Sequence, residues 1–157
     1  MAGSSGYLYV VRMAPTALTT AKTLIQVVAG AAAFDVVKAT VSQVTKSTSE
    51  MLRIQLLRKT AVATVTAFTP LLTNPADPAS LAIGGTSLTG VNATAEGTNG
   101  DVLEDEVWNI LNGTWNYLPI PEGRKRAAQA GNLALVLITA PAASMTIGAT
   151  LEIVEYR

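Results

Sequence analysis

Hydrophobic and polar residues alternate along much of this chain, which is the spacing of a β-strand with one buried face. Leu52, Ile54 and Leu56 fall on one side of such a strand. The intervening Arg53 and Gln55 fall on the other side. This pattern predicts a strand that packs one face against a core and turns the other towards water.

Further segments rich in Val, Ile and Thr lie between turn-forming residues, and they predict strands at 7–13, 23–28, 34–44, 61–68, 106–111, 133–139 and 145–153. Many short strands in succession are typical of an all-β fold, either a sandwich or a jelly roll. A length of 157 residues fits one domain. We therefore expect a single-domain, jelly-roll-like β-sandwich over residues 7–157, preceded by a flexible N-terminal arm at 1–6.

One predicted strand is apolar on both faces, because every residue of the run 133–138 is hydrophobic. One face of this strand should meet the core. The other face should meet either a second layer of the same chain or a neighbouring subunit.

The segment 69–100 is the least regular part of the chain, since Pro, Gly and small polar residues dominate it. It predicts a long irregular excursion that lies over a partner or contains short strands of its own, at 80–83 and 91–95. Gly84 and Gly85 within it are candidate partner-contact residues.

The composition narrows the function classes. Hydrophobic residues make up 49% of the chain and charged residues 14%, which favours burial against other subunits. Eleven basic residues balance eleven acidic ones, so we expect neither nucleic acid nor a membrane as a partner. Without Cys or His there is no thiolate nucleophile and no imidazole base. We expect no enzyme, no metal site and no cofactor.

Three consecutive positive charges, Arg124, Lys125 and Arg126, follow a proline-stiffened turn. They are a candidate contact for an acidic surface on a partner protein.

An acidic cluster precedes them in the sequence and consists of Asp101, Glu104, Asp105 and Glu106. Its spacing differs from that of a calcium-binding loop, and strand alternation places Glu104 and Glu106 on the opposite face from Asp105. The cluster therefore predicts an acidic surface that faces solvent or a subunit.

Trp108, Trp115 and Tyr117 lie close together in the sequence. Aromatic strips on β-sandwiches can stack on sugar rings. Because the surrounding residues are apolar, we interpret these three as aromatic anchors of the core, with carbohydrate binding as the alternative.

Several segments, in this order, resemble small β-rich structural proteins encoded among the head genes of tailed bacteriophages, the capsid decoration or cement proteins: 20–27, 50–54, 115–122, 140–142 and 148–155. The resemblance implies a virion protein on the capsid exterior, made in the host cytoplasm. It implies the major capsid protein as partner and a homo-oligomer, often a trimer, that bridges capsid subunits.

The expected function is thus to stabilise a phage shell by binding, with attachment through irregular segments, chiefly residues 2–7 and the excursion at 69–100. Two alternatives stay open. The chain could form a capsid or filament lattice itself, or serve as a carbohydrate-binding module for host attachment.

Overall fold

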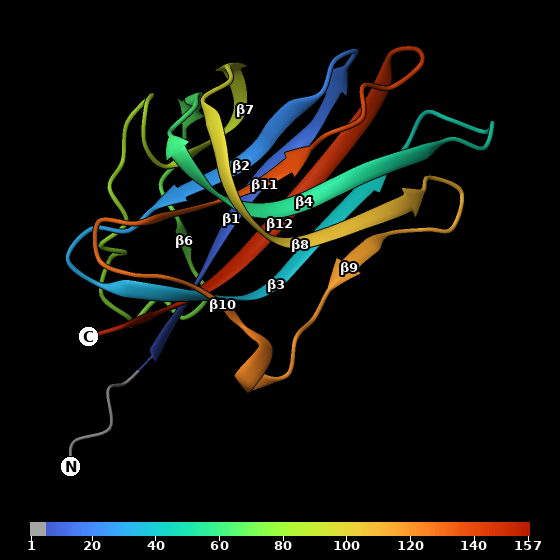
Figure 1. Ribbon diagram of the computed structural model, residues 1–157. Helices are drawn as coiled ribbons and strands as arrows, with labels where there is room; N and C mark the ends of the chain where they lie inside the picture. The colour runs from blue at the N-terminus through green and yellow to red at the C-terminus, as the bar shows by residue number, and fades with distance from the viewer. Residues whose placement is uncertain (1–5) are drawn as a thin grey trace.

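The computed structural model describes residues 6–157, and its regular structure is almost entirely β (Figure 1). The described residues contain one 3-10 turn, η1 (Pro121–Gly123), and no helix long and apolar enough to cross a membrane. The strands are β1 (Gly6–Leu18), β2 (Lys22–Val28), β3 (Ala33–Gln43), β4 (Met51–Ala61), β5 (Thr64–Ala67), β6 (Leu71–Leu72), β7 (Gly90–Ala95), β8 (Thr98–Asn109), β9 (Trp115–Tyr117), β10 (Lys125–Ala127), β11 (Asn132–Leu137) and β12 (Met145–Tyr156).

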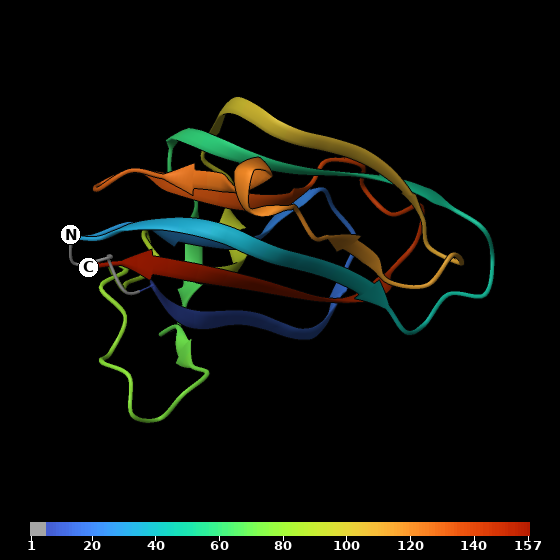
Figure 2. The ribbon, with the colours of Figure 1, turned by 90° about the horizontal axis from the view of Figure 1, so that it is seen from below.

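These strands form two antiparallel sheets that face each other (Figure 2). The first sheet has the order β10-β3-β12-β1-β6, and β9 also pairs with β3. The second sheet has the order β5-β7-β2-β11-β4-β8. In Figure 2 the red, cyan and dark blue strands of the first sheet lie below the green, orange and yellow strands of the second.

The first four strands alternate between the two sheets, and later strands insert between them. β1 and β3 enter the first sheet and β2 and β4 the second; later, β12 inserts between β1 and β3, and β11 between β2 and β4. This interleaving is the jelly-roll arrangement of two packed sheets. The expected jelly-roll-like, all-β sandwich is confirmed.

The main core lies between the sheets, and the predicted alternation of β4 supplies part of it. Leu52, Ile54 and Leu56 are fully buried there, while Arg53 is exposed. The expectation that Gln55 faces water is wrong, because only 7% of this residue is exposed. Gln55 is paired with Val136 of β11 on one side and with Asp105 of β8 on the other. Residues paired in this way share a face of the sheet, so both neighbours shield Gln55 from water.

The two-faced strand β11 meets its own chain on both sides. Leu133, Leu135 and Leu137 join the main core. Ala134 and Val136 form a second buried cluster with Leu57, and partly buried Ile138 packs against it. The apolar run therefore needs no neighbouring subunit to bury its second face.

A continuous antiparallel ribbon lies beside this second face, since its residues Glu96, Gly97 and Asn99 line one cavity together with Val136 and Ile138. β4 pairs with β8, and β5 pairs with β7. Because β5 follows β4 and β8 follows β7 along the chain, the two pairs of strands form one long two-stranded ribbon. The ribbon bends where they join, because β4 also pairs with β11 whereas β7 pairs with β2. Gly97 lies at the bend, where any Cβ would overlap the carbonyl oxygen of Ala61.

The excursion at 69–100 is more regular than the sequence indicates. β6 pairs with β1, the expected strand at 91–95 is present in β7, and β8 begins at Thr98. The strand expected at 80–83 does not form. The backbone N–H groups of Leu81 and Ala82 donate to the Glu155 carboxylate instead of to a neighbouring strand.

The expected N-terminal arm lies mostly outside the described residues, which begin at Gly6. Gly6 itself is the first residue of β1 and is paired with Tyr156 of β12.

Candidate partner-binding groove

The three basic residues around β10 have different surroundings. Lys125 forms an ion pair with Glu104 of β8, with 3.2 Å between Nζ and Oε2. Arg126 forms two hydrogen bonds to Asp35 of β3, at 2.6 and 3.0 Å. Their charges are therefore largely neutralised within the chain. Among the described residues, Arg124 forms no ion pair, and its Nε is buried without a hydrogen-bond partner.

Arg126 is further fixed by an aromatic side chain. Its guanidinium carbon lies 5.1 Å from the centre of the Tyr156 ring, within the range of a cation–π interaction. The hydroxyl of Tyr156 also donates to Asp35 at 2.9 Å. The hydrogen bonds that Arg126 donates to Asp35 raise the pKa of Arg126 above its ordinary value. Arg126 thus stabilises the edge of the first sheet.

Gly84 and Gly85 lie elsewhere. Gly84 forms an isolated bridge with Thr89, next to β7, which pairs with β2 in the second sheet. β10, in contrast, pairs with β3 at an edge of the first sheet. The fold therefore does not gather the candidate partner-contact residues into one surface.

The three candidate aromatic anchors are buried: 4% of Trp108, 6% of Trp115 and 7% of Tyr117 is exposed. Each also has a hydrogen bond. Trp108 Nε1 donates to the carbonyl of Gly113 at 2.9 Å, and the Tyr117 hydroxyl donates to that of Gly123 at 3.0 Å. Burial raises the pKa of Tyr117. These rings expose too little surface for a sugar to stack on them.

A groove of about 370 Å³ opens where the two sheets separate, between β8 on one side and β9, η1 and β10 on the other. The residues that line it are Glu104, Glu106, Asn116, Tyr117, Leu118, Pro119, Ile120, Gly123 and Lys125. It therefore brings together one residue of the basic run, one of the aromatic anchors and part of the acidic cluster.

The acidic wall of the groove follows the predicted alternation of β8. Glu104 and Glu106 line the groove, whereas Asp105 pairs with Arg53 on β4. Glu106 accepts a hydrogen bond from Trp115 Nε1 at 2.7 Å. The hydrogen bond from Arg53 lowers the pKa of Asp105. No group of three or more acidic side chains within residues 6–157 is placed to hold a metal ion.

The opposite lip of the groove is apolar and projects into solvent. Leu118 is 75% exposed and Ile120 is 70% exposed, the two highest values among the large hydrophobic residues that the structure describes. Pro119 and Pro121 flank Ile120 and restrict its backbone. Leu118 directly follows the aromatic anchors in the sequence but does not join the core, because the buried part of this segment ends at Tyr117. The Pro-Ile-Pro spacing was the available signal, because prolines on both sides prevent a paired strand.

Comparison with known proteins does not assign the chain to a group: no family model, no curated protein and no solved structure matches it.

Proposed function

We propose that this chain is a structural virion protein that binds the outside of a phage capsid and stabilises the shell by bridging major capsid subunits. The observation that carries the proposal is the apolar lip, where Leu118 and Ile120 stand exposed on a proline-stiffened loop. Apolar side chains held in this way are typical of a surface that another protein covers.

The rigidity of the lip also favours binding. Proline fixes one backbone dihedral at each of Pro119 and Pro121, and the hydrogen bond from the Gly123 N–H to the Ile120 carbonyl, 2.9 Å, closes the turn. Little conformational entropy is then lost when the lip meets a partner. The groove behind it adds Glu104, Glu106 and Lys125 as polar contacts at its rim.

The capsid as the partner rests on the resemblance of the sequence to decoration proteins, and the jelly-roll fold, which is common in viral capsid proteins, is compatible with it. Binding would stabilise the capsid through thermodynamic linkage. A protein that binds only the assembled lattice stabilises that lattice, and many copies sum their effects.

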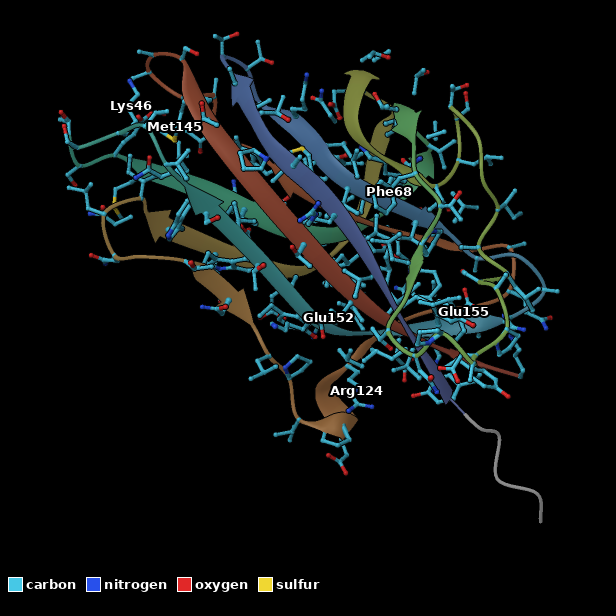
Figure 3. The ribbon with its side chains drawn as sticks, turned by 180° about the vertical axis from the view of Figure 1, so that it is seen from behind. Lys46, Phe68, Arg124, Met145, Glu152 and Glu155 are labelled. Carbon is cyan, nitrogen blue, oxygen red and sulfur yellow. The ribbon has the colours of Figure 1, made fainter. Side chains whose placement is uncertain are left out.

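The test is binding of the purified protein to undecorated mature capsids of the phage that encodes it, followed by co-sedimentation. We expect the double substitution Leu118→Asp and Ile120→Asp to lower occupancy at least about 10-fold, since two apolar contacts are lost. Val44→Asp is the matched control, because Val44 is 67% exposed and lies in the loop after β3. Lys46 in that loop and Arg124 behind the lip lie far apart in Figure 3.

Equal occupancy for the lip variant and the wild type would refute the lip as the contact. Absence of wild-type binding to capsids would refute the proposed function itself. The same sedimentation without capsids tests the lattice alternative, in which the protein alone forms large assemblies. The carbohydrate alternative is not favoured, because Trp108, Trp115 and Tyr117 are buried.

A further inference from the structure

A lysine side chain is fully buried near the end of β4, beneath the connection between β7 and β8. The side chain of Lys59 has no exposed surface. Burial lowers the pKa of Lys59, and the nearby Glu96 offsets this only in part. A desolvated lysine spends more time as the neutral amine, which is the nucleophilic form.

The nearest polar group to this amine is a carboxamide. Lys59 and Asn99 are paired directly opposite each other on β4 and β8. Lys59 Nζ donates a hydrogen bond to Asn99 Oδ1 at 2.8 Å, which brings the nitrogen next to the carbonyl carbon. The strand register is irregular on both sides of this pair, and such irregularities redirect side chains.

The backbone of Lys59 is held in place by a second asparagine, on β11. Its N–H donates to Asn132 Oδ1 at 2.7 Å, and its carbonyl accepts from Asn132 Nδ2 at 3.0 Å. The amine is thus positioned from both ends of the residue.

A carboxylate completes the group. Glu96 Oε2 lies 3.6 Å from Lys59 Nζ. Two hydrogen bonds from Thr23 orient this carboxylate, one from the backbone N–H at 2.8 Å and one from the hydroxyl. Gly97 permits the chain to pass close enough to β4 for Glu96 and Asn99 to reach Lys59.

We propose that Lys59 and Asn99 join in an intramolecular isopeptide bond, with Glu96 as the proton carrier. The neutral amine of Lys59 attacks Cγ of Asn99, and a bond forms between Nζ and Cγ. Glu96 accepts a proton from Nζ and gives it to Nδ2 of Asn99. The bond between Cγ and Nδ2 then breaks, and ammonia leaves. Nothing is oxidised or reduced, and Glu96 returns to its starting form.

Asn99 is the electrophile for two reasons. Its oxygen is nearer to Nζ than that of Glu96, and a carboxylate anion resists attack by an amine. Both Glu96 and Asn99 also line a cavity of about 220 Å³ whose other walls include Val136 and Ile138. This cavity opens to solvent and gives ammonia a route out.

The link would close a loop around residues 60–98, which contains almost all of the irregular excursion. A covalent bond here restricts the unfolded chain in the way that a disulfide does, in a protein without cysteine. The proposal does not depend on capsid binding, so either can fail alone.

The test is the intact mass of the purified, full-length protein, which we expect to be lower than the sequence mass by one ammonia. Tryptic digestion should give a branched peptide that joins Lys59 to Asn99, with no cleavage after Lys59. Lys59→Arg should restore the full mass and lower the melting temperature. Glu96→Gln should slow formation of the link by about 100-fold or more, the usual size of a general acid–base contribution.

Two controls make the result specific. Asn99 precedes Gly100, and an Asn-Gly pair can lose ammonia by cyclising on its own backbone; that loss would persist in Lys59→Arg. The internal control is Lys22, whose Nζ donates to Asn92 Oδ1 at 3.0 Å but forms no ion pair with a carboxylate among the described residues. Asn92→Ala should therefore keep the mass loss.

An unchanged wild-type mass would overturn the proposal, and this measurement needs no variant that folds. Loss of water in place of ammonia would assign the link to Glu96 and would also overturn it. Loss of ammonia without the branched peptide would do the same.

Discussion

Glu155 is a buried carboxylate that fastens the irregular excursion to the end of the sandwich, and its replacement by glutamine tests this role. Only 1% of Glu155 is exposed. Its oxygens accept hydrogen bonds from the Ser80 hydroxyl, from the Leu81 N–H at 3.0 Å and from the Ala82 N–H at 3.3 Å. Arg157 adds a contact at 3.3 Å. In Figure 3 the excursion passes beside the labelled Glu155.

The magnitude follows from the charge of the acceptor. A hydrogen bond to a charged group contributes about 1.5–3 kcal/mol, roughly twice a neutral one. Glu155→Gln keeps the volume but loses the charge. The N–H groups of Leu81 and Ala82 donate to different oxygens of Glu155, so the amide NH2 of glutamine must face one of them in either orientation. We expect a loss of about 2–3 kcal/mol of the free energy of unfolding, since one of these hydrogen bonds is lost and the others no longer have a charged acceptor. For a domain of this size that is about 4–12 °C in melting temperature.

Glu152→Gln is the matched control, because Glu152 lies on the same strand but on its outer face (Figure 3). Its side chain is 24% exposed and forms an ion pair with Lys38 at 3.2 Å. Surface ion pairs contribute about 0–1 kcal/mol, so this variant should melt within about 4 °C of the wild type. Limited proteolysis of Glu155→Gln should cut first within 73–89. Equal melting shifts for the two variants would refute the anchoring role.

Three further predictions use simpler measurements. Ile54→Ala should cost about 2–5 kcal/mol of unfolding free energy through lost burial and a cavity, and Arg53→Ala far less; equal shifts in thermal unfolding would contradict the register of β4. Deletion of residues 2–5, which leaves β1 intact, should keep the melting temperature and lower capsid occupancy; unchanged occupancy would exclude the N-terminal arm as an anchor. Sedimentation of the free protein should show a closed oligomer such as a trimer, and a clean monomer at micromolar concentration would count against it.

Most of the fold could be predicted from the local alternation of hydrophobic and polar residues. Alternate residues of a strand share a face, so the core positions of β4 and β12 could be predicted from the sequence alone. The same rule, continued past Ile153, makes Glu155 an inward residue, and an inward carboxylate requires donors. The sequence does not show which donors, because Ser80 and Leu81 come from a segment without any periodicity.

The groove could not be predicted from the sequence, for a related reason. Alternation placed Glu104 and Glu106 on one face of β8, but it could not show that Lys125 and Trp115 lie opposite them. Those contacts depend on how β9 and β10 join β3 at the edge of the other sheet. Residues far apart in the sequence meet there only through the jelly-roll topology.

The excursion at 69–100 also changes how attachment through it would work. β6 holds its start on β1, Glu155 holds its middle, and β7 holds its end on β2. The Tyr9 hydroxyl adds a hydrogen bond of 2.7 Å to the Pro78 carbonyl. A segment fixed at so many points presents a preformed surface and loses little entropy on binding.

If the excursion contacts the capsid, Glu155→Gln should weaken decoration as well as folding, because it releases a segment that the intact chain holds in one conformation. Lip variants should leave the anchoring of this segment intact, so the two sites can be separated by comparing occupancy with susceptibility to proteolysis.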